Sequence, residues 1–181
     1  RCQLGAPGPS GAWELVFFYA FFQRTAPSAL VPDLMRSFDV SASALGSLSA
    51  FYFCAYTAVQ LPTGLMADRW GSRRLLTFAA LASAVGGLLF ASTDSIGVAG
   101  IGRLLVGAGA GFGFICTLRI ATDWFPPERL ALLTGMTMML GMLGGFTGRA
   151  PLALAVAEFG WRASMIAVAS FGILIGLGTW L

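Results

Sequence analysis

Six long apolar segments divide this chain, and they constrain its fold more than any other feature of the sequence. They cover residues 13–32, 44–67, 75–92, 96–118, 130–157 and 163–181. A helix rises about 1.5 Å per residue, so each segment is long enough to cross a hydrocarbon core of about 30 Å. Backbone groups that face lipid must be hydrogen-bonded within their own segment, which excludes irregular spans. We therefore expect an all-α protein with six transmembrane helices in residues 13–181, preceded by a cytoplasmic segment at residues 1–12.

Composition excludes most other classes of protein. Charged residues make up only 10% of the chain and hydrophobic residues 57%, whereas soluble domains carry about 25% charged residues. Histidine is absent, which removes a Ser–His protease and most zinc sites. Cys2, Cys54 and Cys116 are too far apart for a metal motif, and the last two lie in apolar segments, where we expect small core residues. We expect no enzyme activity, no metal, no cofactor and no nucleic acid partner.

Arginines are unevenly divided between the two sets of connections. One set carries Arg69, Arg73, Arg74, Arg119 and Arg129, and the other carries only Arg36 and Arg162. Positive charge marks the cytoplasmic side of a membrane protein. We therefore expect a multi-pass protein of the lipid bilayer, in a bacterial inner membrane, with its N-terminus in the cytoplasm.

The connection between the second and third segments carries a charged turn, "GLMADRWGSRR". The turn resembles the G-x-x-x-D-R-x-G-x-R-R signature of the major facilitator superfamily of secondary transporters, although Ser72 stands where that family often has arginine. A second stretch, "RLLVGAGAG" at residues 103–111, resembles the family's R-x-x-x-G-x-G-x-G sequence in helix 4. The resemblance implies transport by alternating access. It also implies that the chain is the amino-terminal half of a twelve-helix protein, a fragment whose partner is its own C-terminal six-helix half.

The same resemblance implies that the charged turn is a conformational latch. Its residues are Gly64, Asp68, Arg69, Gly71, Arg73 and Arg74. A carboxylate held between guanidinium groups and a facing helix end forms charge-assisted hydrogen bonds, and we expect Asp68 to lie between Arg73 and Arg74 in this way. The alternative is that the arginines only set the topology.

Two stretches of sequence 89 positions apart resemble each other weakly. They are "QLPTGLMADRWGSR" and "RAPLALAVAEFGWR", in which Pro62 pairs with Pro151, Gly71 with Gly160 and Arg73 with Arg162. The two stretches are expected to end on opposite faces of the membrane. This pattern predicts two inverted three-helix repeats, as in transporters that alternate access around a midplane site, with coincidence as the alternative.

Glycines recur on the fourth and fifth segments at a spacing of four. Gly107, Gly109 and Gly111 lie on the fourth, and Gly141 and Gly145 on the fifth. Small residues at this spacing let helices approach closely in lipid. We expect these glycines to serve helix packing, with a direct role in gating as the alternative.

Three arginines lie inside apolar segments. Arg24, Arg103 and Arg149 are each seven or eight residues from the outer end of their segment, about 11 to 12 Å deep. A charge at depth costs on the order of 3 kcal/mol, so we expect the three to bind a small organic anion, since guanidinium binds carboxylates bidentately. The alternative for each is a structural, snorkelling residue.

The first segment also resembles helix 1 of organic-anion symporters, in the stretch "QRTAPSALVPDL". Gln23 stands where those proteins have aspartate, so a coupling proton or ion is possible but has no evident site. An aromatic run precedes it: Phe17, Phe18, Tyr19, Phe21 and Phe22. We expect this run to contact lipid, with the wall of a cavity as the alternative. The other functions left open are a non-transporting assembly or sensory protein of the same fold, and a transporter of a neutral or hydrophobic solute.

Overall fold

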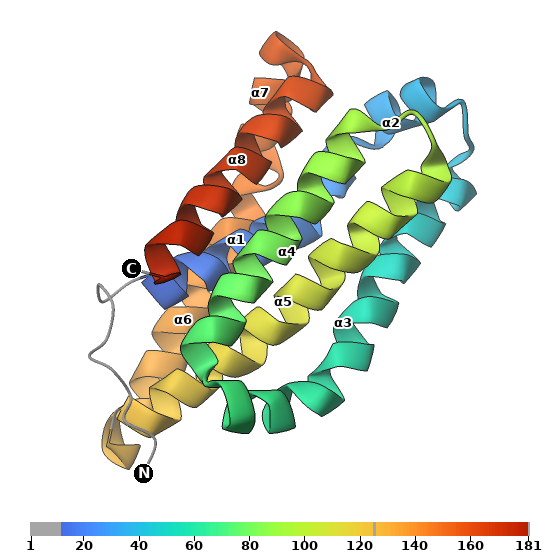
Figure 1. Cartoon of the computed structure of the whole chain (residues 1–181). Helices are drawn as coiled ribbons and strands as arrows, with labels where there is room; N and C mark the ends of the chain where they lie inside the picture. The colour runs from blue at the N-terminus through green and yellow to red at the C-terminus, as the bar shows by residue number, and fades with distance from the viewer. Residues whose placement is uncertain (1–11, 125, 181) are drawn as a thin grey trace.

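The computed structural model describes residues 12–124 and 126–180, and every regular element in these residues is a helix (Figure 1). The helices are α1 (Ala12–Ala29), α2 (Val31–Phe38), α3 (Ala42–Trp70), α4 (Ser72–Ser92), α5 (Ile96–Trp124), α6 (Pro127–Thr147), α7 (Ala150–Phe159) and α8 (Trp161–Trp180). The prediction of an all-α fold is confirmed. The segment predicted at residues 1–12 lies almost wholly outside the described residues.

Five stretches of the described chain are long and apolar enough to cross a membrane. They are Ala42–Trp70, Ser72–Ser92, Ile96–Thr122, Pro127–Phe159 and Trp161–Trp180. Helix α1 is not among them, because Glu14, Gln23 and Arg24 lower its hydropathy. The sixth span therefore remains a prediction for α1.

The prediction of one uninterrupted helix over residues 130–157 is wrong, although Pro127–Phe159 still qualifies as one membrane span. The structure divides this segment into α6 and α7 at Gly148 and Arg149. Gly148 closes α6 by donating its N–H to the Gly144 carbonyl at 2.9 Å, and Arg149 donates to the Phe146 carbonyl at 3.1 Å. Hydropathy could not reveal this break, because the sequence is apolar on both sides of it.

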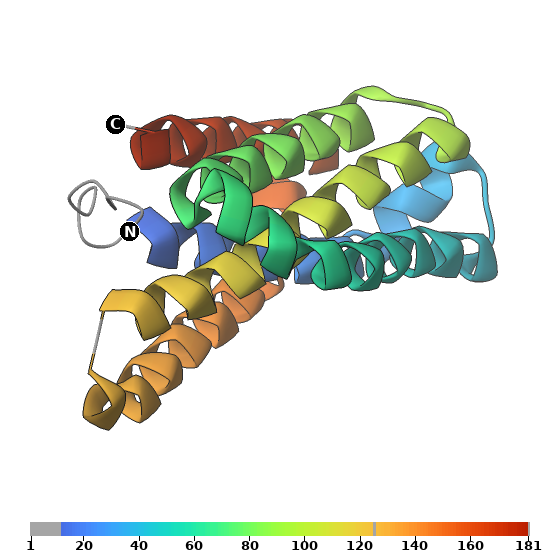
Figure 2. The same cartoon turned by 60° about the horizontal axis from the view of Figure 1, so that its bottom comes forward.

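The helices form a bundle in which α5 has the most central position among the long elements. Helix α4 runs beside α5 on one side and α3 lies on the other, while α8 packs on the far side of α4 (Figures 1 and 2). Helix α1 lies behind this layer and packs against α6. The short helix α2 crosses one end of the bundle, which we call the α2 end. The opposite end, where α3 joins α4, is the Gly71 end.

Glycines permit the closest approaches in the bundle. A Cβ added at Gly107 of α5 would collide with the backbone carbonyl of Tyr52 on α3, and one added at Gly111 with Val59 and the Tyr56 carbonyl. Gly109 faces the opposite way and lies against Ser83 and the Ala79 carbonyl of α4. Helix α5 is therefore held between two neighbours at distances that no larger residue would allow.

Glycines also allow close contact between α1 and α6. Gly141 lies against the Phe17 ring, and a Cβ at Gly144 would collide with a backbone carbonyl of α1. Gly145 has only ordinary contact, at 3.6 Å, with Thr25. Its carbonyl instead accepts a hydrogen bond of 3.0 Å from the Thr25 hydroxyl, which links the two helices directly.

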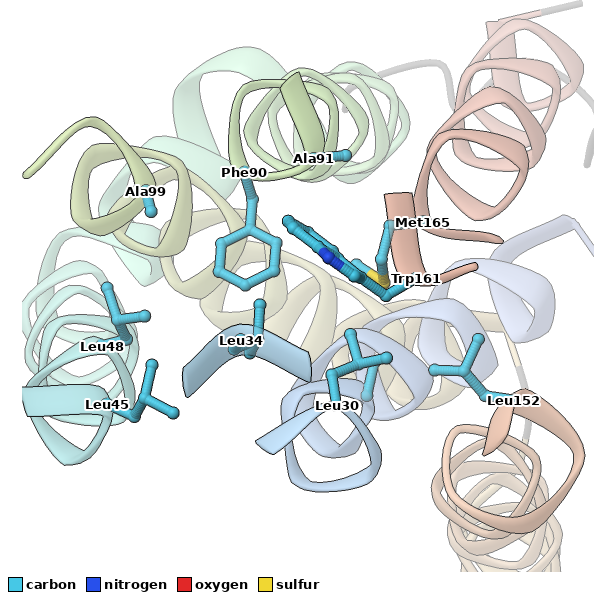
Figure 3. Packing of buried hydrophobic residues seen from close by; sticks show 11 residues of the cluster. Leu30, Leu34, Leu45, Leu48, Phe90, Ala91, Ala99, Leu152, Trp161 and Met165 are labelled. Atoms are coloured by element: carbon cyan, nitrogen blue, oxygen red, sulfur yellow. The ribbon is translucent and has the colours of Figure 1, made fainter. Parts of the chain in front are cut away.

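A hydrophobic cluster fills the α2 end around the side chain of Trp161 (Figure 3). The Trp161 indole donates a hydrogen bond of 2.9 Å to the Ser37 hydroxyl of α2. Its ring lies 6.1 Å from the rings of both Phe38 and Phe90. Leu34 of α2 is buried in the same cluster. These contacts join α2, α4 and α8.

The backbone repeats at the offset of 89 that the sequence predicted. Gly71 has φ 82° and ψ 144°, and Gly160 has φ 81° and ψ 157°. The N–H of Gly71 donates to the Ala67 carbonyl at 3.0 Å, and that of Gly160 to the Val156 carbonyl at 2.9 Å. Glycine is needed at both junctions because this region of positive φ is essentially closed to other residues.

The two helices that follow these glycines, α4 and α8, pack antiparallel. Arg73 in the first turn of α4 donates hydrogen bonds to the carbonyls of Thr179 and Trp180 at the end of α8, at 3.1 and 2.9 Å. Between these ends the hydroxyls of Thr77 and Thr179 are 3.1 Å apart. Equivalent junctions at opposite ends of the bundle are the arrangement that an inverted repeat requires.

Candidate substrate pocket and charged junctions

One pocket lies where α1, α3 and α5 meet. Its walls are the side chains of Phe17, Ala20, Phe21, Arg24, Tyr52, Tyr56, Ala110 and Phe114. Within each helix these residues are spaced by three or four positions, or by one, which places them on one face. Three ordinary helical faces therefore build the pocket, and five of its eight side chains are aromatic.

Arg24 is the only charged residue in the wall of this pocket. Its side chain is exposed, and its Cζ lies 5.1 Å from the ring centroid of Phe53 and 5.7 Å from that of Phe21. Within residues 13–122 and 126–180, no carboxylate forms an ion pair with it. The guanidinium is thus held by aromatic rings, and its hydrogen-bonding edge is available to a ligand.

Arg103, which we expected to bind an anion, is buried and does not line the pocket. It is only 3% exposed, and its Nη1 donates a hydrogen bond of 3.0 Å to the backbone carbonyl of Gln23. Its Cζ lies 4.8 Å from the centroid of the Tyr52 ring. Tyr52 is among the residues that line the pocket and Arg103 is not, so Arg103 is not available to a ligand there.

Arg149 lies at the break between α6 and α7, where it is the N-cap residue of α7. Its side chain is exposed but does not line the pocket. The structure therefore does not bring the three arginines together. They share an approximate depth in the sequence pattern, but Arg24 lies on α1, Arg103 on α5 and Arg149 between α6 and α7, and of the three only Arg24 lines the pocket.

The aromatic run of α1 is less exposed than a lipid-facing run would be. Phe17 is fully buried and Tyr19 nearly so, and Phe17 and Phe21 line the pocket. The expectation of lipid contact is wrong for these residues. The buried Gln23 donates a hydrogen bond of 2.7 Å to the Tyr19 hydroxyl, which further ties this run to the interior.

The two cysteines in the described part of the chain differ in exposure. Cys116 is buried, as predicted, whereas Cys54 is exposed on α3, so its prediction as a core residue is wrong. Cys2 lies outside the described residues. Among the described side chains, no three of the His, Cys, Asp and Glu type come together as metal ligands would.

The charged turn at the Gly71 end makes two contacts between helices. Asp68 of α3 forms an ion pair of 2.5 Å with Arg119 of α5. Arg73 instead contacts the end of α8. The expected placement of Asp68 between Arg73 and Arg74 is therefore wrong, because its partner comes from a helix 51 positions away in sequence.

The remaining residues of the turn have simpler surroundings. Arg69 and Arg74 are exposed. Gly64 is partly buried, with open space where a Cβ would lie. At the α2 end, Arg162 forms an ion pair with Asp94, and its Cζ lies 5.1 Å from the Trp161 ring centroid. Each junction glycine is therefore followed, two positions later, by an arginine that contacts another helix or its connection.

The fold and the pocket define a class: an all-helical, multi-pass membrane protein with a mainly aromatic pocket between its helices. The sequence profile of the Major Facilitator Superfamily matches residues 14–181. The chain belongs to this superfamily.

Several relatives and one solved structure show the extent of the similarity. A probable sulfoacetate transporter of Cupriavidus necator is 26% identical over 90% of this chain and 38% of its own length. A probable L-galactonate transporter of Escherichia coli is 26% identical over 92% of this chain and 38% of its own. The crystal structure of a bacterial homologue of the human lysosomal transporter Spinster, inward-facing and occupied, superposes with a TM-score of 0.86 at 20% identity, over 93% of this chain and 42% of that one. This chain therefore spans well under half the length of the proteins it matches.

Proposed function

We propose that this chain forms part of a secondary transporter that moves a small organic anion across a membrane, and that Arg24 binds the anionic group. The observation that carries the proposal is the exposed guanidinium of Arg24 in the wall of the pocket. Its N–H groups meet aromatic faces and no acid among the described side chains. A bound anion would supply the missing partner.

The surroundings of Arg24 would strengthen such binding. Alanine and aromatic side chains make up the rest of the pocket wall, so the local dielectric constant is lower than that of water and charge pairs there are stronger. Stacking on Phe21 and Phe53 restrains the planar guanidinium before a ligand arrives. A restrained fork loses less entropy when it binds a carboxylate through two hydrogen bonds.

Two relatives are named as transporters of organic anions, which supports an anionic substrate. Sulfoacetate and L-galactonate are both organic anions. Arg103 and Arg149 are not part of this proposal as direct ligands, since neither lines the pocket. The coupling ion, if there is one, has no candidate among the residues of the pocket.

We also infer that the Gly71 end is a latch that faces the cytoplasm. Its arginines outnumber those of the opposite end, which favours a cytoplasmic N-terminus and a bacterial inner membrane. The contacts of Asp68 with Arg119 and of Arg73 with the end of α8 would hold this end together. A C-terminal six-helix half would then close the other side of the pocket.

The test of the anion proposal uses the complete gene product in detergent and in proteoliposomes. Small carboxylates, sulfonates and phosphates are screened for binding by calorimetry, with benzyl alcohol as a neutral comparator. Arg24→Lys keeps the charge but loses the planar fork, so it should weaken binding of the best anion about tenfold. Arg24→Ala should nearly abolish binding.

Arg149→Ala is the matched control, because it removes an exposed arginine that does not line the pocket. It should bind the best anion with nearly unchanged affinity. If the tightest ligand is neutral, or if Arg24→Ala binds the anion normally, the proposal is wrong and Arg24 is a structural residue.

A further inference from the structure

The wall around Arg24 offers very few groups to a hydroxyl-rich solute. Besides the guanidinium, the only polar side-chain atoms in the wall are the hydroxyls of Tyr52 and Tyr56. Among the side chains that the structure describes, none of Asn, Gln, Asp, Glu, Ser or Thr lines the pocket. A sugar acid that entered would leave several hydroxyl groups without partners on this wall, and each unpaired buried hydroxyl costs on the order of 1–3 kcal/mol.

The aromatic side chains form two stacked pairs. The rings of Tyr52 and Tyr56 are 6.1 Å apart with an interplanar angle of 13°, and those of Phe17 and Phe114 are 6.0 Å apart at 28°. Phe21 adjoins Phe17 with its ring centroid 4.8 Å away. Flat rings from three helices therefore line the same pocket as the guanidinium of Arg24.

This wall is held rigidly by what lies behind it. Phe17 is fully buried and contacts Gly141 of α6, while Tyr52 is 2% exposed and has Arg103 against its ring. The Tyr52 backbone is also fixed, because Gly107 packs directly on its carbonyl. A preformed wall binds a rigid, flat ligand at low entropic cost.

We propose that the substrate of this site is an aromatic organic anion, such as an aromatic monocarboxylate, whose carboxylate binds Arg24 and whose ring packs on the partly exposed rings of Phe21, Tyr56 and Phe114, which line the pocket together with the buried Phe17 and Tyr52. The inference rests on the proposed function and narrows it to a class of substrate. Aromatic anions differ from the two acids for which the relatives are named: L-galactonate is rich in hydroxyl groups, and sulfoacetate is small and polar. An aromatic cation is excluded by Arg24 itself, and a neutral aromatic solute would leave the guanidinium unpaired.

The experiment compares three probes on the complete gene product by isothermal titration. Benzoate has one negative charge and a ring, gluconate has one negative charge and many hydroxyls, and benzyl alcohol has a ring and no charge. Benzoate should bind at least about tenfold more tightly than either of the others, the difference that one or two unpaired hydroxyls or a lost charge pair produce. Arg24→Ala should reduce benzoate affinity to the level of benzyl alcohol.

A second variant tests the wall separately from the charge. Phe114→Leu keeps an apolar side chain but removes one ring of a stacked pair, and should weaken benzoate binding about three- to tenfold while leaving gluconate binding unchanged. Phe171→Leu is the matched control, since Phe171 is an exposed residue of α8 outside the pocket. Size-exclusion profiles and thermal unfolding show whether both variants fold like the parent.

The outcomes separate the two proposals. If gluconate binds as tightly as benzoate, and Arg24→Ala abolishes that binding, the proposal of an aromatic substrate is wrong and the proposal of an anion transporter stands. Benzyl alcohol binding as tight as benzoate binding, and unaffected by Arg24→Ala, would overturn both. Equal effects of Phe114→Leu and Phe171→Leu on benzoate, or no benzoate binding at all, would overturn the aromatic substrate.

Discussion

The junction of α3 with α4 and the junction of α7 with α8 have the same backbone but different charges. At both, a helix ends, a glycine with φ near +80° follows, and a new helix begins at the next residue. The first junction carries Asp68, whose carboxylate binds Arg119 of another helix. At the second, the nearest acid is Glu158, which is one position past the offset of 89 and is exposed.

The arginines that follow the two glycines differ in the same way. Arg73 donates two hydrogen bonds to carbonyls at the C-terminus of α8, where the helix dipole favours a positive charge. Arg162 pairs with Asp94, a residue of the connection after α4 that is itself exposed. The repeat thus maintains the path of the chain, while the charged links between helices are more numerous at the Gly71 end.

The first prediction is that the two junctions lie on opposite sides of the membrane, as an inverted repeat requires. Trp70 and Phe159 are equivalent positions, and both are exposed. In a background without Cys2, Cys54 and Cys116, Trp70→Cys should react with an impermeant maleimide only from the cytoplasmic side. Phe159→Cys should react only from the other side. Labelling of both from one side would contradict the inverted repeat.

The second prediction compares the two acidic residues in the complete gene product. Asp68→Asn removes the ion pair with Arg119. If that pair favours one state by about 1.4 kcal/mol, its loss changes the ratio of states about tenfold, and transport of the best substrate should fall by a similar factor. The amount of protein in the membrane should stay normal, because partly exposed pairs contribute little to stability.

Glu158→Gln is the matched control for Asp68→Asn. It removes the acid nearest to the equivalent position, one residue past the offset of 89, for which the described residues provide no ion pair. Transport should change by less than about twofold. Equal losses in the two variants would show that the Gly71 end has no special role as a latch.

The smallest expected effects concern the two glycines. Gly71→Ala and Gly160→Ala should each cost about 1–3 kcal/mol, because alanine is strained at this positive φ, although space for a Cβ is open at both positions. Thermal unfolding in detergent should fall by a few degrees in both. Gly178→Ala, in an open position within α8, should leave the midpoint unchanged or raise it. A lower unfolding midpoint in only one of the two variants would show that the two glycines do not stabilise their junctions in the same way.

Much of the fold could be predicted because lipid imposes simple rules on sequence. Long apolar runs identified the helices, and the spacing of 89 between Gly71 and Gly160 located the two junctions. The break near Arg149 could not be predicted in this way. Pro62 lies inside the continuous helix α3, whereas Pro151 begins α7 just after a break, so proline alone does not decide where a helix ends. At Gly148 the chain also contacts the Phe22 carbonyl of α1, a tertiary contact that hydropathy does not contain.

The candidate site was only partly predictable for a related reason. Depth along a helix can be counted from the sequence, but the direction of a side chain around the helix depends on which neighbours pack against it. Arg24 and Arg103 have similar depth, yet one lines the pocket and the other is buried behind Tyr52. Likewise, the nearest arginines to Asp68 in sequence were not its partner, because the packing of α3 on α5 places Arg119 there.

The hydrogen bond between Trp161 and Ser37 has a consequence for how the protein is made. The two residues are 124 positions apart, and at about 5–20 residues per second a ribosome needs roughly 6 to 25 s to synthesise that length. Helix α2 leaves the ribosome early, but the indole that anchors it is added only with α8. During that interval the buried face of α2, with Leu34, lacks the α8 part of its hydrophobic cluster. Ser37 therefore waits longer for its partner than Thr25, Arg73 or Thr77 does, so the α2 end gives a chaperone or a membrane insertase the longest time to act.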